Sequence, residues 1–334
     1  MELMIRIDIP ASEWKMETGA KVLLVGSCFA DEVGQRFVRG GFEAMVNPFG
    51  TLYNPASIAV NLLRALSEKE VELPRSSIIP SVGASISTWG TPVDRCGARR
   101  LTGVGHTVFE DAEGRWHSWL HHSSFSSADA ATVVERINST THRVADFLRE
   151  VDALIVTFGT AIIYRLKETG MLVANCHKQS DNLFVRERLS AYDIVDQWQM
   201  LLQLLESVNP KLKVIFTVSP IRHKRDGYHV NQISKGILLQ AVDEMVNGNI
   251  PDDPIVNRKS SNSEYDYFPS YEIMMDELRD YRFYADDMIH PSEKAVEYIW
   301  QRFQDTYFDN KTKDAVAKAT KEWRQRQHRT IIED

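Results

Sequence analysis

The sequence predicts an α/β protein built on a mainly parallel sheet with helices on both faces. Short apolar runs of strand length, at residues 22–25, 153–160 and 213–218, alternate with longer segments whose apolar residues recur at the helical period. Long helices between consecutive strands imply crossover connections, which join parallel strands and cover the sheet. The alternation of the segments and the crossover connections that it implies together predict the α/β fold class.

The first strand and the first helix meet at Ser27. Residues 22–25 form an apolar run that stops at Gly26, and the apolar residues of 29–37 then follow at every fourth position. A hydroxyl at this point ends a strand and begins a helix, where unpartnered backbone N–H groups and the helix dipole can stabilise an oxyanion. Ser27 is therefore a candidate nucleophile. The alternative is a serine that only caps the helix.

The segments after the first helix continue the alternation. Residues 42–46 are expected to form a second strand, followed at 47–55 by a fixed loop that holds two prolines and a glycine. Pro55 then opens a helix that reaches Leu66. Residues 70–127 break into short pieces rich in Ser, Gly, Thr and aromatic residues, so we expect an inserted hairpin beside the main sheet.

Three later segments have the helical period, at 128–150, 194–205 and 295–303. Pro291 is expected at the first position of the last helix, which makes His290 the residue before it. Just upstream, residues 265–271 form an aromatic loop that could line a substrate pocket or pack in the core.

Length, charge and cysteine content limit the class of protein. The 334 residues suit one large α/β domain or two smaller ones, and we expect a single domain over 1–310, an insertion at 70–127 and a basic helical tail at 311–334. The net charge of −7 argues against a nucleic-acid binder. We expect no signal peptide and no membrane span. Three cysteines fit a reducing compartment, so we expect a cytoplasmic location.

Parallel sheets bind ligands outside the carboxyl ends of their strands. The residues that follow the predicted strands, and could share one crevice, are Ser27, Gly50, Gly159, Thr160, Ser219 and Pro220.

A second polar pair lies near the end of the chain. Asp287 and His290 stand three residues apart in a turn, so the carboxylate and the imidazole can meet. With Ser27 they make the order Ser, Asp, His, which is a hydrolytic combination. The alternative is a histidine that caps the last helix beside an acidic neighbour.

These motifs resemble the GSCFA family, whose name is the sequence Gly-Ser-Cys-Phe-Ala found at 26–30. The resemblance runs from about residue 21 to 303. It includes Asn-Pro-Phe-Gly at 47–50, Tyr-Asn-Pro at 53–55, His-Ser at 122–123, Phe-Gly-Thr at 158–160, Asn-Cys-His-Lys at 175–178, Ser-Pro-Ile-Arg at 219–222 and Asp-Met-Ile-His at 287–290. The family looks like a branch of the SGNH/GDSL hydrolases, which are esterases, lipases, carbohydrate deacetylases and some acyl transferases. The resemblance implies their three-layer, flavodoxin-like α/β/α fold.

The resemblance also implies a catalytic triad of Ser27, Asp287 and His290. Ser27 matches the nucleophile of the first block, with Gly-Ser-Cys-Phe standing where Gly-Asp-Ser-Leu usually does. The match is loose because no Asp precedes Ser27. Asp287 and His290 match the final Asp-x-x-His pair.

The oxyanion hole implied by the resemblance uses the backbone N–H groups of Ser27 and Gly50. The third block departs from the family pattern, because Ala161 stands where an oxyanion-binding Asn is expected. Loss of such a donor can cost roughly 10²–10³ in rate, so a substitute is needed. Asn175 is the first candidate and Asn47 the second.

Other polar residues are candidates to bind the substrate or to lie on the surface. They are Asn47, Thr160, His177, Lys178 and Arg222, with His223 beside Arg222, and with His121 and His122 at the pocket edge or packed in the insertion. Cys28 and Cys176 could supply a thiolate nucleophile. Together with His177 and His290 they could bind a metal, but no pair has the short spacing of zinc sites, so we expect no metal and no cofactor.

We therefore expect a serine esterase that hydrolyses an acyl ester, such as an acetyl ester, of a small molecule or carbohydrate. His290 takes the proton from Ser27, Asp287 orients His290, and water resolves the acyl-enzyme. One alternative is an acyl transferase that uses the same serine with a hydroxyl acceptor. The other is a binding protein without catalysis on a hydrolase scaffold.

Overall fold

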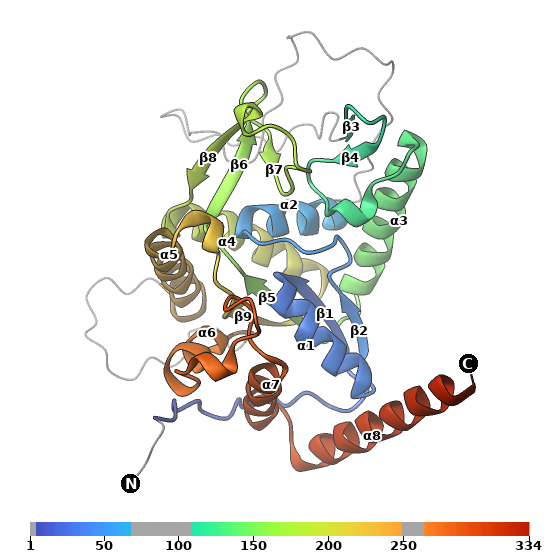
Figure 1. Cartoon of the computed structure of the whole chain (residues 1–334). Coiled ribbons are helices and arrows are strands. Elements are labelled where there is room, and N and C mark those ends of the chain that lie inside the picture. The colour runs from blue at the N-terminus through green and yellow to red at the C-terminus, as the bar shows by residue number, and fades with distance from the viewer. Residues whose placement is uncertain (1–4, 68–107, 249–263, 334) are drawn as a thin grey trace.

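A five-stranded parallel sheet forms the centre of the computed structural model, which describes residues 5–67, 108–248 and 264–333 (Figure 1). In spatial order its strands are β10 (Tyr265–Phe268), β9 (Lys213–Val218), β5 (Ala153–Phe158), β1 (Lys21–Gly26) and β2 (Glu43–Val46). Every neighbouring pair is parallel. Numbered along the chain, these strands have the flavodoxin-like order 2-1-3-4-5.

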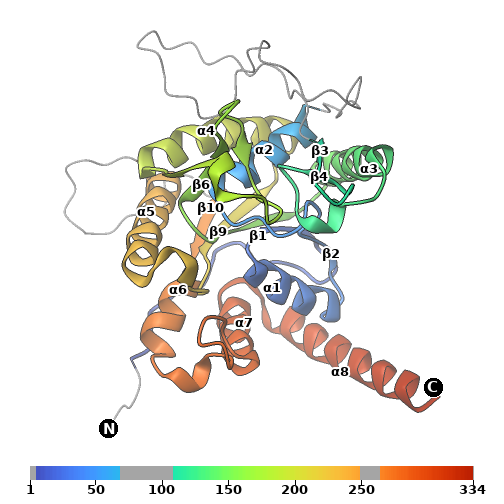
Figure 2. The same ribbon diagram turned by 45° about the horizontal axis from the view of Figure 1, so that its top comes forward.

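Helices cover both faces of this sheet (Figure 2). One face packs against α2 (Pro55–Leu66), α3 (Ala130–Leu148), α4 (Ala191–Val208) and α5 (Tyr228–Asn247), and the other against α1 (Cys28–Arg39) and α7 (Glu293–Tyr307). Because successive strand residues point to opposite faces, Leu23 joins the first of these cores and Leu24 the second. The predicted three-layer α/β/α fold is confirmed.

The last helix, α8 (Asn310–Glu333), packs on α1 and then extends beyond the body of the molecule (Figure 2). Val316 is buried in the contact, and the guanidinium of Arg39 lies 4.6 Å from the ring centroid of Trp323. This helix occupies the segment expected to form a basic tail, while the domain boundary at 310 stays a prediction. Within the described ranges, no helix has the length and apolar character needed to cross a membrane.

Two small antiparallel sheets lie beside the main one. The hairpin of β3 (Val108–Glu110) and β4 (Trp116–Ser118) packs on α3, and a three-stranded sheet has the order β7 (Leu172–Val173), β6 (Ile162–Leu166), β8 (Phe184–Arg188). The hairpin agrees with the insertion expected at 70–127, of which residues 70–107 lie outside the described part. The three-stranded sheet was not predicted, because its strands are short and one is exposed along most of its length.

Most of the predicted elements of the main layers are present. The strands expected at 22–25, 42–46, 153–160 and 213–218 and the helices expected at 55–66, 128–150, 194–205 and 295–303 all have counterparts. Helix α5 was not predicted, because its N-terminal half buries the polar residues Asn231, Ser234 and Lys235. Its C-terminal half does have an apolar stripe, which includes Leu238, Val242 and Met245.

Two expectations near the last motif are wrong. The aromatic segment beginning at Tyr265 is strand β10, paired with β9, and not a loop. Helix α7, expected to start at Pro291, begins at Glu293, because the side chain of Ser292 caps it by accepting the backbone N–H of Ala295 at 3.3 Å.

Candidate active site

The turn between β1 and α1 is fixed by a close approach of two strands. Gly26 has φ +138°, and a Cβ on it would lie 2.1 Å from the carbonyl oxygen of Thr157 on β5. The next residue, Ser27, donates its backbone N–H to the same oxygen at 3.1 Å. Only glycine fits at the end of β1, and α1 therefore begins directly above the carboxyl end of the sheet.

Ser27 is the N-cap of α1. Its side-chain oxygen accepts the backbone N–H of Phe29 at 3.3 Å, and the residue is only 1% exposed. Among the described residues, no hydrogen bond joins Ser27 to His290. A role for Ser27 as nucleophile therefore stays a prediction that this contact pattern does not favour.

The thiol of the following residue meets the histidine. Cys28 Sγ lies 3.7 Å from His290 Nε2, and His290 Nδ1 lies 2.5 Å from Asp287 Oδ2. The other carboxylate oxygen, Asp287 Oδ1, accepts the backbone N–H groups of Ile289 at 2.9 Å and His290 at 3.0 Å. The structure thus brings the predicted pair Asp287 and His290 together and adds a thiol where a hydroxyl was expected.

The backbone of the Asp-Met-Ile-His turn is strained in a way that supports this contact. Met288 has φ +57°, in the left-handed region that non-glycine residues rarely adopt. This conformation curls the turn so that one carboxylate receives both backbone N–H groups and the imidazole. Thiol, imidazole and carboxylate consequently follow one another as in a catalytic triad.

The charges of the thiol and the carboxylate at neutral pH follow from their surroundings. Burial raises the pKa of the Cys28 thiol above its ordinary value of 9.0, and the nearby carboxylate of Asp31 raises it further. The backbone N–H and the ring of His290 lower the pKa of Asp287 to about 2. The site therefore holds a neutral thiol and an ionised carboxylate, and the thiol needs a base before it can attack.

Asn47 connects this loop to the first helix. Its Oδ1 accepts the backbone N–H of Gly26 at 2.8 Å, and its Nδ2 donates to Asp31 Oδ1 at 2.8 Å. With φ +39°, Asn47 also starts the turn in which the N–H of Gly50 donates to the Asn47 carbonyl at 2.8 Å. The N–H of Gly50, expected in the oxyanion hole, already has an acceptor.

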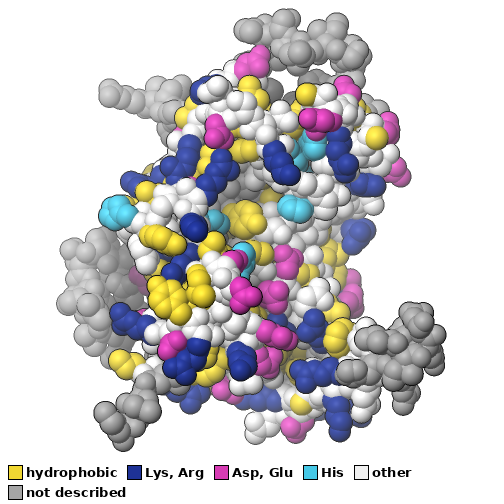
Figure 3. Space-filling view, viewed as in Figure 1, with side chains coloured by type: hydrophobic (Ala, Val, Ile, Leu, Met, Phe, Trp, Pro, Cys, Tyr) yellow, Lys and Arg dark blue, Asp and Glu magenta, His cyan; other side chains and the backbone are white. Residues whose placement is uncertain are grey.

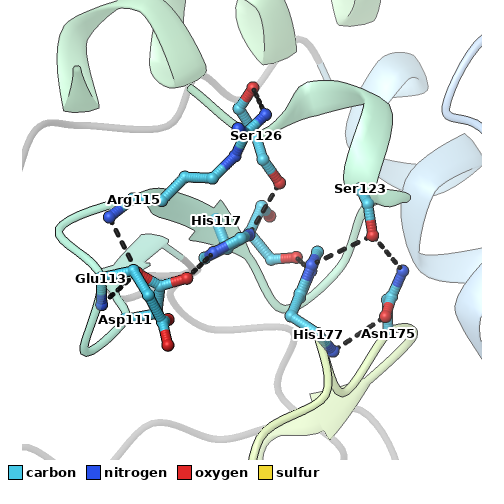
Figure 4. Close-up of polar contacts among 9 residues, drawn as sticks. Asp111, Glu113, Arg115, His117, Ser123, Ser126, Asn175 and His177 are labelled. Carbon is cyan, nitrogen blue, oxygen red and sulfur yellow. Dashed lines mark hydrogen bonds and ion pairs between the residues drawn. The ribbon is translucent and has the colours of Figure 1, made fainter. Parts of the chain in front are cut away.

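Asn175 and His177 belong to a polar cluster around the β3–β4 hairpin (Figure 4). Asn175 Nδ2 donates to Ser123 Oγ at 3.2 Å, while its Oδ1 accepts the backbone N–H of His177 at 2.9 Å. His177 Nε2 lies 2.7 Å from the carbonyl oxygen of Ser118, and burial lowers the pKa of His177 to about 4. These contacts tie the loop to the hairpin, whereas the neighbouring Lys178 is exposed.

The same cluster contains a second chain of Ser, His and Asp. His117 Nδ1 lies 2.7 Å from Ser126 Oγ, and its Nε2 lies 2.6 Å from Asp111 Oδ2 (Figure 4). His117 and Ser126 are buried, and Asp111 Oδ1 accepts the N–H groups of Glu113 and Arg115 in the hairpin turn. This chain holds the hairpin together.

Thr160 and Arg222, both expected to bind substrate, form hydrogen bonds with other residues of the protein. Thr160 donates its backbone N–H to the carbonyl of Tyr53 at 2.9 Å, and its hydroxyl lies 3.1 Å from Ser234 Oγ. The guanidinium of Arg222 donates to the hydroxyl of Tyr284 at 2.8 Å. Their roles in substrate binding stay predictions.

Three groups near Cys28 or His290, namely Tyr53, His223 and Lys235, were not assigned to the triad or the oxyanion hole from the sequence. The Tyr53 side chain has a raised pKa, chiefly through burial and also through Cys28. Its ring packs edge-on against His223, with centroids 5.5 Å apart. Lys235, 1% exposed, donates its ammonium to the carbonyls of Gly159 at 2.7 Å and Ser219 at 2.6 Å. For Lys235, the sequence gives no signal except its position next to Ser234.

The other cysteine in the described residues, Cys176, lies away from these groups. Cys176 packs beside the cluster of Trp119, Met171, Val173 and Phe184, and burial raises the pKa of its thiol to about 11. Within the described part of the chain, no three His, Cys, Asp or Glu side chains are grouped so that they could hold a metal ion. On the face drawn in Figure 3, acidic and basic side chains are interspersed, and histidines reach the surface near the centre.

Two solved structures are similar to the chain at low sequence identity. No curated protein matches the chain. Similar solved structures include a carbohydrate esterase family 3 from Talaromyces cellulolyticus, at 10% identity and TM-score 0.32, covering 85% of this chain and 94% of that one. Another is the acetyl xylan esterase Est2A from the rumen bacterium Butyrivibrio proteoclasticus, at 9% identity and TM-score 0.37, covering 90% of this chain and 64% of that one. Values this low carry no argument about activity.

The sequence model of one protein family matches most of the chain. It covers residues 21–83 and 99–303, and so includes the Gly-Ser-Cys-Phe-Ala signature and the Asp-Met-Ile-His turn. The chain belongs to the GSCFA family.

Proposed function

We propose that this protein is an acyl-ester hydrolase whose nucleophile is the thiol of Cys28. The contact that carries the proposal is Cys28 Sγ to His290 Nε2 at 3.7 Å, continued by His290 Nδ1 to Asp287 Oδ2 at 2.5 Å. A nucleophile, a base and a group that orients the base are the three parts of covalent acyl transfer. The ester substrate, on a small molecule or carbohydrate, follows from the resemblance to SGNH/GDSL hydrolases.

The family motif supports the thiol over the neighbouring hydroxyl. In Gly-Asp-Ser-Leu the nucleophile stands two residues after the glycine, and Cys28 stands two residues after Gly26. Ser27 then corresponds to the Asp of that block. Its hydroxyl already accepts the N–H of Phe29, which gives it a structural role.

The reaction proceeds in two halves. His290 Nε2 removes the thiol proton while Sγ forms a bond to the acyl carbon, and the carbonyl oxygen becomes an oxyanion. The oxyanion collapses, the bond to the alcohol oxygen breaks, and His290 returns the proton to the leaving alcohol. His290 then takes a proton from water as the water oxygen bonds to the thioester carbon. The carbon–Sγ bond breaks, the carboxylic acid leaves, and His290 returns the proton to Sγ of Cys28. Asp287 keeps the imidazole in the required tautomer and stabilises its charged form.

Two properties of the site support this order of events. Because the pKa of Cys28 is raised, the thiol is neutral at pH 7 and depends on His290 for its deprotonation. As the first residue of α1, Cys28 also has a backbone N–H without an intrahelical acceptor, which can donate to the oxyanion.

The test uses the whole chain with an activated acetyl ester, p-nitrophenyl acetate, and an alkyne-tagged iodoacetamide. We expect Cys28→Ala to lose both hydrolysis and the label at position 28. His290→Ala should lower hydrolysis about 10²–10⁴-fold. Cys176→Ala is the matched control, because it removes another partly buried thiol of raised pKa and should leave hydrolysis unchanged.

Three results would change the assignment. Hydrolysis that survives Cys28→Ala but not Ser27→Ala, with fluorophosphonate labelling of Ser27, would return the nucleophile to the serine. Acetyl transfer to an added sugar in preference to water would make the protein a transferase. If neither reagent labels the site of the wild type and no acyl-enzyme is trapped, the protein is a binding protein on a hydrolase scaffold.

A further inference from the structure

The proposed reaction needs a second donor for the oxyanion, besides the N–H of Cys28. The N–H groups of Gly159 and Thr160, in the third block, both donate to the carbonyl of Tyr53, at 2.7 and 2.9 Å. Ala161 is fully buried in the core. The third block therefore supplies no donor of its own.

The other donors expected from the sequence are also occupied. The N–H of Gly50 donates to the carbonyl of Asn47, and Asn47 Nδ2 donates to Asp31. Asn175 Nδ2 donates to Ser123 in the hairpin cluster. A hole built from these groups would first have to break existing hydrogen bonds.

One polar atom beside the third block has no partner. His223 Nε2 is buried and makes no hydrogen bond, and it lies 3.2 Å from the point where a Cβ on Gly159 would stand. The backbone N–H of His223 donates to Asn231 Oδ1 at 3.0 Å, which holds the residue just beyond β9. Buried polar atoms are almost always satisfied, so an unpaired nitrogen here requires a ligand or another explanation.

We infer that His223 is a catalytic residue that donates its Nε2–H to the oxyanion, in place of the amide missing at Ala161. The inference rests on the proposed acyl-transfer function and assigns a further residue to it. The carbonyl oxygen of the ester receives one hydrogen bond from Cys28 N–H and one from His223 Nε2–H as the Sγ–C bond forms.

The surroundings of His223 keep its imidazole neutral and in place. Burial lowers its pKa to about 3, and electrostatic interactions with Lys235 and His290 lower it further. Lys235 donates to the carbonyls of Gly159 and Ser219, and so holds together the segments that follow β5 and β9. Lys235 is a positioning residue in this scheme.

Access to Nε2 requires one side chain to move. Tyr53 packs edge-on against the imidazole and is 37% exposed, whereas Gly159 is held by the backbone. Tyr53 therefore rotates away when the acyl group enters, and its pKa is already sensitive to the Cys28 thiol beside it.

The test compares a reaction that forms an oxyanion with one that does not. Acyl transfer from p-nitrophenyl acetate creates negative charge on a carbonyl oxygen, whereas alkylation of Cys28 by iodoacetamide only forms an Sγ–C bond and expels iodide. We expect His223→Leu to lower kcat for the ester about 10²–10³-fold and to leave the alkylation rate of Cys28 unchanged. His223→Gln, which restores an N–H donor, should recover part of kcat. His229→Leu, at an exposed histidine on α5, is the matched control.

The outcomes separate the inference from the function on which it rests. Unchanged kcat in His223→Leu overturns the inference and leaves the Cys28 mechanism intact. A parallel fall in kcat and in the alkylation rate also overturns it, because His223 would then act on the thiol or on the fold. Hydrolysis that persists in Cys28→Ala refutes the proposed function itself, whatever the His223 variants do.

Discussion

Replacing Asp287 with Asn tests the proposed triad at the group that orients the base. The Asp287 carboxylate has two separate tasks. Its Oδ1 accepts the N–H groups of Ile289 and His290 at 2.9 and 3.0 Å, and its Oδ2 faces His290 Nδ1 at 2.5 Å. An Asn carbonyl can keep the first task, so the turn should survive the substitution.

The second task is reversed by the substitution. The amide nitrogen of Asn would donate to His290 Nδ1, which puts the proton of the neutral ring on Nε2. Nε2 faces Cys28 Sγ at 3.7 Å and could then no longer accept the thiol proton. Loss of general-base catalysis predicts a fall in kcat/KM of about 10²–10⁴-fold at neutral pH.

The pH dependence distinguishes this cause from a general loss of structure. Burial raises the pKa of Cys28, so above pH 9.0 a growing fraction of thiolate forms without a base. The ratio of wild-type to Asp287→Asn activity on p-nitrophenyl acetate should therefore shrink as pH rises. The control is Asp286→Asn, which removes the same charge from the preceding exposed residue. An Asp287→Asn variant within about 10-fold of wild type at neutral pH would refute the reasoning.

Three further predictions concern stability, each followed by urea unfolding. Ser27→Ala removes the N-cap of α1 and should lower the free energy of unfolding by about 0.5–2 kcal/mol, with little change in hydrolysis; loss of hydrolysis in a folded variant would contradict this. Gly26→Ala places a Cβ 2.1 Å from the Thr157 carbonyl oxygen and should cost about 2–6 kcal/mol, the sum of overpacking and a strained φ, so a stable variant would disprove the close approach. The pKa of His177 is lowered from 6.5 to about 4, so the unfolded chain binds more protons between these values and stability should fall as pH drops through them. His177→Asn should reduce this slope, and an unchanged slope would contradict the assignment.

Local patterns in the sequence were sufficient for the main layers and for half of the site. The apolar runs at β1, β5 and β9 and the period of α1 are visible without any tertiary information, because each element buries a face set by its own repeat. The pairing of Asp287 with His290 is also local, since three residues of a turn bring the two side chains together. Family membership likewise follows from motifs read along the chain.

Elements whose burial depends on distant partners were missed. Strand β10 has four residues, and its status as a strand comes from its pairing with β9. Helix α5 buries Lys235, which is favourable only because the carbonyls of Gly159 and Ser219 receive its ammonium. Neither the pairing of β10 nor the burial of Lys235 follows from its own segment, although the apolar residues from Leu238 to Val246 do have the helical period.

Only the tertiary structure decided which of two adjacent side chains meets the histidine. Ser27 is the N-cap with extended backbone and Cys28 is the first helical residue, so the two side chains leave the backbone in different directions. The hydroxyl turns back onto the first turn of α1, and the thiol faces His290, which lies 262 residues further along the chain. The sequence by itself predicted that a side chain at the end of β1, an imidazole and a carboxylate share one crevice, whereas packing between the two ends of the chain determined that the atom facing the imidazole is sulfur.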